Sequence, residues 1–113
     1  MTPDKKTIRE RKAELVAALR LPPDEGGYLQ GRGRLCWESL NGVQPDHFCC
    51  MGVATNLAVL AGACDWGGSA TTPSAQVKRY FGLSGDAVSR CVFMNDNDRK
   101  TFPEIADWIE ANL

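Results

Sequence analysis

Apolar residues recur at helical spacing near the start of the chain, with charged residues between them. They are Ile8, Leu15, Val16 and Leu19. Spacings of this kind place the side chains on one face of a helix. Thr2-Pro3, ahead of this stripe, combines a capping residue with a proline suited to the first helical turn. We therefore predict an amphipathic helix from about residue 3 to residue 20, ended by Pro22-Pro23.

A second stretch is apolar on nearly every side of a helical wheel. Residues 47–49 are predicted to run extended into this helix, which covers about residues 50–63. A helix that is apolar all round belongs in the centre of a fold. Two shorter helices are predicted after it. The first opens at Thr72-Pro73 and closes at Gly82, a residue that suits a left-handed C-cap, and Ser84 caps the second.

The clearest helix signal lies at the end of the chain. Thr101 and Glu104 have the spacing of a capping box, in which each side chain satisfies a backbone amide at the helix start. One apolar stripe follows, consisting of Phe102, Ile105, Ala106, Ile109 and Leu113. We predict that this terminal helix docks on the core.

One segment has the pattern of short strands. Residues 28–30 and 35–37 flank Gly31-Arg32-Gly33-Arg34, whose glycines can adopt positive φ, so the sequence predicts a small β-hairpin. No repeat or linker divides the 113 residues, which favours a single domain over residues 1–113. The predicted fold class is α+β and mainly helical, with four to five helices around the central apolar helix and one small β-hairpin.

Composition and charge exclude several classes of protein. The chain is 43% hydrophobic and 24% charged, as is typical of a globular domain. A net charge of −1 argues against a dedicated nucleic-acid-binding protein, which would need clustered Lys and Arg. Residues 1–34 nevertheless carry eight basic and five acidic residues, and residues 35–113 carry five and nine. This asymmetry indicates either a basic interface in the N-terminal third or an ordinary solvated surface.

The five cysteines are odd in number and irregularly spaced, and no apolar signal segment follows the basic start. The longest apolar stretch, residues 48–64, is shorter than the roughly 20 residues that cross a bilayer. We therefore expect a cytoplasmic protein without membrane association, whose thiols are reduced. Because no Cys-x-x-Cys pair is present and two adjacent cysteines rarely bind one tetrahedral ion, we expect no metal site. We also expect no cofactor.

His47 and the adjacent pair Cys49 and Cys50 are the main candidates for catalysis. A Cys at the start of a helix has its thiolate stabilised by unpaired amides and by the helix dipole, as a nucleophile requires. His47 is the only histidine that could act as its base. The sequence places no orienting partner beside His47, so we favour buried structural cysteines. A cysteine-dependent hydrolase or transferase is the alternative.

A second set of candidates lies around the predicted hairpin. Arg32 and Arg34, helped by Tyr28 and Gln30, could hold an anionic nucleotide or another phosphate. A plain hairpin turn explains the same residues.

Asp96 and Asp98 are further candidates for a binding surface. They belong to an acidic run over residues 95–98, which lacks the glycine and the terminal glutamate of a calcium-binding loop. The structural interpretation of this run is the end of one helix leading into the cap of the next.

Two motifs resemble those of a known family. They are Phe-Cys-Cys-Met-Gly-Val over residues 48–53, and Asn95-Asp96 followed by Phe-Pro-Glu-Ile-Ala-Asp-Trp-Ile-Glu over residues 102–110. They are similar to motifs of small, mostly uncharacterised proteins of tailed bacteriophages and prophages, from which this chain departs at Met51, Ala54-Thr55, Arg99 and Thr101. The resemblance implies a phage origin and action inside the infected cell. It brings no established activity.

From these features we predict a small phage-encoded accessory protein. It would act without catalysis in the host cytoplasm by binding a host protein, for example as a counter-defence inhibitor of the anti-CRISPR kind. Two alternatives stay open: the cysteine-dependent enzyme, and a protein that sequesters a nucleotide near Arg32 and Arg34. The sequence does not indicate the oligomeric state.

Overall fold

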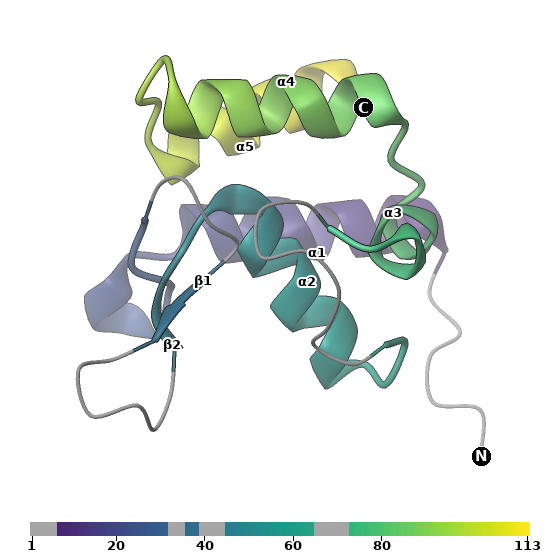
Figure 1. Cartoon of the computed structure of the whole chain (residues 1–113), viewed down its shortest axis with the longest axis horizontal. Coiled ribbons are helices and arrows are strands. Elements are labelled where there is room, and N and C mark those ends of the chain that lie inside the picture. The colour runs from purple at the N-terminus through teal and green to yellow at the C-terminus, as the bar shows by residue number, and fades with distance from the viewer. Residues whose placement is uncertain (1–6, 32–35, 39–44, 65–72) are drawn as a thin grey trace.

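The structure is a computed structural model that describes residues 7–31, 36–38, 45–64 and 73–113. Five α-helices account for most of this part of the chain, beside two short strands (Figure 1). The helices are α1 (Ile8–Arg20), α2 (Cys50–Leu60), α3 (Ala75–Phe81), α4 (Gly85–Asp96) and α5 (Phe102–Asn112), and the strands are β1 (Cys36–Glu38) and β2 (Pro45–Phe48). The prediction of a mainly helical protein is confirmed.

Helix α1 begins later than predicted. The Thr7 hydroxyl accepts a hydrogen bond from the Glu10 amide at 3.1 Å, and the Glu10 carboxylate accepts one from the Thr7 amide at 3.1 Å. These two bonds form a capping box and fix the first turn at Ile8. The predicted start near Thr2-Pro3 is therefore wrong, and those two residues lie outside the described ranges.

Helix α2 contacts α1, α3, α4 and β2. Its first six residues, from Cys50 to Thr55, are all buried. The helix ends at Leu60, a few residues earlier than predicted, because Gly62 adopts a φ of 77°. In the turn that follows, the Ala63 amide donates to the Ala58 carbonyl at 2.9 Å, which closes the helix end.

The caps of the last three helices agree largely with the sequence signals. Thr101 and Glu104 form the predicted capping box of α5, and Ser84 caps α4. Gly82 ends α3 in the left-handed conformation, with a φ of 64°. One start is wrong: the Ser74 hydroxyl accepts the capping hydrogen bond from the Val77 amide, so α3 begins at Ala75, and the predicted cap Thr72 lies outside the described residues.

The strands pair differently from the prediction. β1 pairs antiparallel with β2, and Cys36 lies opposite Phe48. On the other side of β2, the Phe48 amide donates to the Leu29 carbonyl at 2.8 Å and the Gly31 amide donates to the Phe48 carbonyl at 2.7 Å. The predicted hairpin between residues 28–30 and 35–37 is therefore not seen in the described residues, because Phe48 takes the backbone hydrogen bonds of residues 29–31.

The helices enclose one core. Helix α1 packs chiefly against α5 and also against α2 and α3, while α4 lies beside α5 (Figure 1). Every helix contributes fully buried side chains. The largest of these are Leu15, Leu19, Cys50, Met51, Val53, Val77, Phe81, Cys91, Asn95, Ile105 and Ile109. Among the described helices, none is both long and apolar enough to cross a membrane.

Candidate functional site

The Cys49 thiol is part of the fold at the start of α2. Its sulfur acts as the N-cap and accepts a hydrogen bond from the Gly52 amide at 3.3 Å. Such a bond favours the thiolate, as the position at a helix start suggests. However, Cys49 is only 3% exposed, and this burial raises the pKa of the Cys49 thiol to about 11. At neutral pH the sulfur is therefore a protonated, enclosed thiol.

Cys50 is more deeply buried. Its thiol donates to the carbonyl of Cys91 on α4 at 3.3 Å. A hydrogen bond with Cys91, followed by burial, raises the pKa of Cys50 well above its usual value. His47 is exposed on β2, so the only histidine lies on the solvent side while both thiols face the core. Neither Cys49 nor Cys50 is therefore an accessible nucleophile.

Gln30 and Asn95 belong to a polar network inside the protein. The Gln30 Nε2 atom donates to Asn95 Oδ1 at 2.9 Å and to the Lys100 carbonyl at 2.7 Å. Gln30 Oε1 accepts a hydrogen bond from the Phe102 amide at 3.2 Å. Both polar ends of Gln30 therefore hold the segment before β1 against the turn between α4 and α5.

Tyr28 and Asp96 also have partners within the fold. The Tyr28 hydroxyl accepts a hydrogen bond from Asn56 at 2.8 Å, and its ring packs edge-on against Phe48 at 4.9 Å. Asp96 is half-buried and accepts a bond from the Asn95 amide group at 2.8 Å. Asp98 is exposed beyond the end of α4. Tyr28 and Asp96 therefore make contacts within the fold, whereas Asp98 faces solvent.

Arg32 and Arg34 lie outside the described residues, so their predicted role in binding stays a prediction. Within the described ranges, no group of three or more His, Cys, Asp and Glu side chains is arranged to hold a metal ion.

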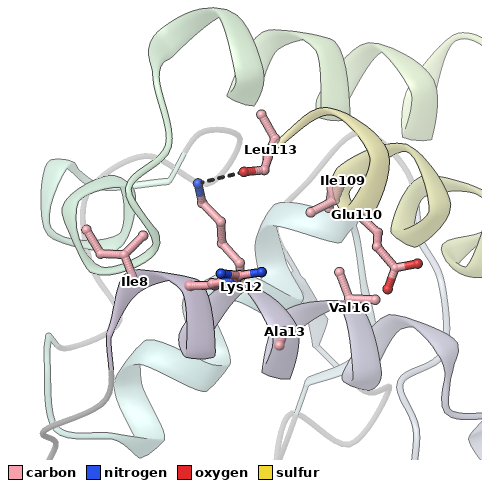
Figure 2. Close-up of a pocket in the computed structure, with 8 residues that line it drawn as sticks. Ile8, Lys12, Ala13, Val16, Ile109, Glu110 and Leu113 are labelled. Carbon is pink, nitrogen blue, oxygen red and sulfur yellow. Dashed lines mark hydrogen bonds between the residues drawn. The ribbon is translucent and has the colours of Figure 1, made fainter.

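A groove between α1 and α5 is the candidate binding site. Its volume is about 610 Å³ (Figure 2). The α1 residues Ile8, Arg9, Lys12, Ala13 and Val16 line one side, and the α5 side consists of Ile109 and Glu110, with Leu113 just beyond the helix. Val16 and Ile109 form a buried floor, whereas Ile8 is 44% and Leu113 40% exposed. The groove therefore has an apolar base and an apolar rim open to solvent.

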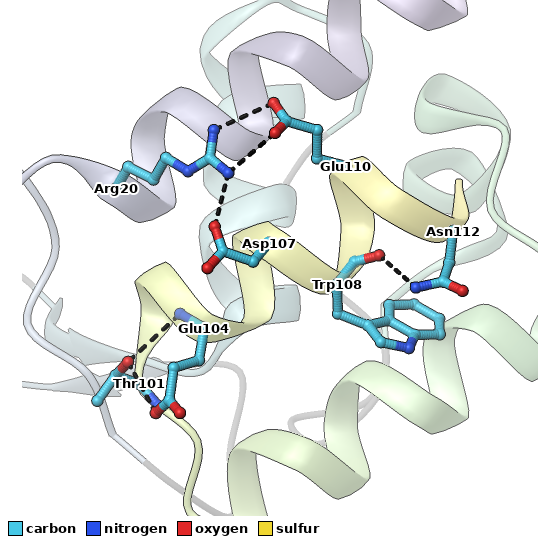
Figure 3. Close-up of polar contacts among 7 residues, drawn as sticks. All are labelled: Arg20, Thr101, Glu104, Asp107, Trp108, Glu110 and Asn112. Carbon is cyan, nitrogen blue, oxygen red and sulfur yellow. Dashed lines mark hydrogen bonds and ion pairs between the residues drawn. The ribbon is translucent and has the colours of Figure 1, made fainter.

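The charges at the groove are unequally satisfied. Lys12 reaches across it, and its ammonium donates to the Leu113 carbonyl at 3.4 Å (Figure 2). Arg9 has no hydrogen-bonding or ionic partner among the described residues. The Glu110 carboxylate instead accepts hydrogen bonds from both terminal nitrogens of Arg20, each at 3.1 Å. Arg20 also forms an ion pair with Asp107 at 2.7 Å (Figure 3). The groove consequently presents cations.

The chain has no significant match to a protein-family model, to a curated protein or to a solved structure. The candidate site is therefore inferred from the geometry of this protein alone.

Sequence reasoning missed this groove. It placed Ile8 and Leu113 in the buried stripes of their helices, but each lies at the outer end of its stripe and is exposed. A usable signal was present: Arg9 and Lys12 are three residues apart and so share a helix face beside Ile8. The basic N-terminal third was predicted as an interface through Arg32 and Arg34, whereas the cations of the groove lie on α1.

Proposed function

We propose that this protein is a non-catalytic binding protein whose partner is a host protein, and that it acts in the cytoplasm of a phage-infected cell as a counter-defence inhibitor. The observation that carries the proposal is the burial of Cys49 and Cys50, which are 3% and 0% exposed. The residues most suited to catalysis in the sequence are thereby withdrawn from any substrate. This counts against the alternative of a cysteine-dependent hydrolase or transferase.

The surface best suited to binding is the groove between α1 and α5. Exposed apolar patches rimmed by polar residues mark interaction sites, and Arg is enriched in protein interfaces. Ile8, Leu113 and Arg9 provide this combination on one face. A small inhibitor that works by covering a partner needs a surface of this kind and no cleft for chemistry.

The first test is capture of partners from a lysate of the bacterium that carries the gene. Ala13→Trp fills the groove from α1, and Ala17→Trp adds the same ring one turn along the helix, where Ala17 is exposed and does not line the groove. We expect one host protein to bind wild type and Ala17→Trp but not Ala13→Trp. The double variant Arg32→Glu/Arg34→Glu tests the predicted contribution of those two arginines.

The second test concerns catalysis. Site-resolved iodoacetamide labelling of the folded protein at neutral pH should leave Cys49 and Cys50 unmodified. Labelling of either thiol faster than free cysteine would overturn the non-catalytic proposal. The nucleotide-sequestering alternative is tested by mass spectrometry of the small molecules that the purified protein releases on denaturation. This alternative requires a nucleotide among them.

A further inference from the structure

We propose that the groove between α1 and α5 binds an acidic amphipathic segment of the partner protein. In this complex an aliphatic side chain of the partner enters the groove, and a neighbouring carboxylate pairs with Arg9 and Lys12. The inference rests on the proposed function and specifies the chemistry of the partner. It follows from the shape of the groove, from its apolar lining and from its charge.

The apolar lining of the groove is the reason for proposing that an aliphatic side chain of the partner enters it. Val16 and Ile109, which are 6% and 1% exposed, form the floor. Ile8 is held in place at the rim because it lies over Gly82, where an added Cβ would come within 2.7 Å of the Ile8 Cγ2 atom. Leu113 forms the opposite rim (Figure 2). A side chain between these rims would bury apolar surface on the protein and on itself.

The open rim favours a protein segment over a small ligand. Sites for small molecules bury most of the ligand surface in an enclosed cavity. Here Ile8 and Leu113 are 44% and 40% exposed, so the described residues give the groove walls but no cover. An amphipathic helix can lay one face into such a groove and leave its other face in solvent.

The charges beside the groove are the reason for proposing that the partner segment is acidic. Arg9 has no ionic partner among the described residues, and the hydrogen bond that Lys12 makes there is to the backbone oxygen of Leu113 at 3.4 Å. Glu110 would oppose an incoming carboxylate, but both of its oxygens are bound to Arg20 (Figure 3). In Figure 2 this carboxylate points away from the Lys12 ammonium. An anion at the groove thus meets the Arg9 guanidinium, which no carboxylate of the described residues neutralises, with the Lys12 ammonium three residues along α1.

The same features disfavour a nucleic acid. Phosphate backbones are bound by rows of cations, and bases by aromatic side chains. The residues that line the groove include two cations and no aromatic side chain.

Titration of the full chain with a labelled helical peptide tests the proposal. The peptide is built from the repeat Glu-Leu-Ala-Glu, and its matched peptide carries Lys in place of Glu. Amide chemical-shift changes should map to α1 and α5 around Ile8, Lys12 and Leu113 for the acidic peptide and be absent for the basic one. Affinity should fall as salt rises, because exposed charges are screened.

Variants with matched controls identify the residues. Arg9→Glu should weaken binding of the acidic peptide by about tenfold or more. Arg90→Glu, an equal charge change at an exposed position on α4, should leave it unchanged. Ala13→Trp should abolish binding and Ala17→Trp should not. Thermal unfolding of each variant confirms that it is folded. Binding that is insensitive to Arg9→Glu and Ala13→Trp, or equal for both peptides, would overturn the proposal.

Two further outcomes separate this inference from the proposed function. Loss of the host partner with Ala13→Trp, combined with no binding of the acidic peptide, would reject the acidic segment and leave the binding function standing. If decanoate binds the groove as tightly as the peptide does, the ligand is a small amphipathic anion and the segment is rejected. If an oligonucleotide does so, the segment is rejected in favour of nucleic acid.

Discussion

Gln30 donates a side-chain hydrogen bond to Asn95 at 2.9 Å, across 65 residues of sequence. Asn95 is fully buried and in turn donates to the Gly31 carbonyl at 2.9 Å. The two amides therefore connect the segment that pairs with β2 to the end of α4. Because Gln30 also accepts from the first amide of α5, three parts of the chain meet at this pair.

Removal of the Asn95 amide should destabilise the protein strongly. In Asn95→Ala the Gln30 amide and the Gly31 carbonyl lose a partner inside the protein, and unsatisfied buried groups cost about 1–3 kcal/mol each. We expect the free energy of unfolding in urea to fall by about 2–4 kcal/mol. Asn97→Ala is the control, since Asn97 is exposed two residues later and should change stability by less than about 0.5 kcal/mol. Equal effects of the two substitutions would contradict the role of the network.

The sequence predicted the helices better than the strands, for a physical reason. The capping box at Thr101 and the cap at Ser84 are local, because the groups that interact are three residues apart. The partner of residues 29–31 is Phe48, a long-range contact that no local spacing specifies. A glycine-rich segment between two short apolar runs indicated a hairpin, and tertiary pairing gave a different register.

The candidate site was predicted only in part, for a related reason. The position of Cys49 at a helix start was correctly inferred, but its reactivity depends on burial by residues distant in sequence. The Asn-Asp run was correctly interpreted as the end of a helix, yet the buried role of Asn95 depends on Gln30. The groove needs α1 and α5 side by side, and their packing cannot be read from either helix alone.

Burial of the Cys49 thiol should make stability depend on pH above neutrality. The pKa of this thiol is about 11 in the folded protein, whereas in the unfolded chain we expect the ordinary value of 9.0. Between these values the unfolded chain loses the proton while the folded protein keeps it, so stability falls as pH rises. The contribution is present in full below pH 9.0 and declines up to about pH 11, by about 3 kcal/mol in all.

Comparison with Cys49→Ala isolates this contribution, because the other titrating groups are shared. The variant should lose about 1 kcal/mol of stability for the missing buried sulfur. Wild type should therefore be the more stable of the two at pH 8, and the order should reverse by pH 11, where the variant should be more stable by about 2 kcal/mol. A difference that stays constant over this range would mean that Cys49 has an ordinary pKa.

The contact between Arg20 and Glu110 can be tested through ionisation of the carboxylate. Its hydrogen bond with Arg20 lowers the pKa of Glu110. In Arg20→Gln we expect the pKa of Glu110 to rise towards the ordinary range, as measured by carboxyl NMR during an acid titration. The pKa of Glu104 is lowered by hydrogen bonds with Thr101 and should not respond, which makes it an internal control. A rise of both values would indicate a general change in α5.

Helix α5 should be required for folding. Phe102, Ile105 and Ile109 are 5%, 0% and 1% exposed, and Ile109 lies opposite α1 in the most extensive helix contact. At roughly 1.5–3 kcal/mol for each large apolar side chain, their loss removes several kcal/mol from a total stability of about 5–15 kcal/mol. Truncation after residue 100 should therefore abolish cooperative thermal unfolding.

A milder substitution keeps this prediction testable if the truncated chain aggregates. Ile105→Ala should lower the free energy of unfolding by about 2–5 kcal/mol, as expected when a fully buried branched side chain is cut back. Removal of Leu113 alone is the control. Leu113 was predicted to belong to the buried stripe, but it is 40% exposed, so its loss should cost much less than Ile105→Ala while opening the rim of the groove. If the two changes have equal effects on stability, the buried stripe of α5 does not end at Ile109.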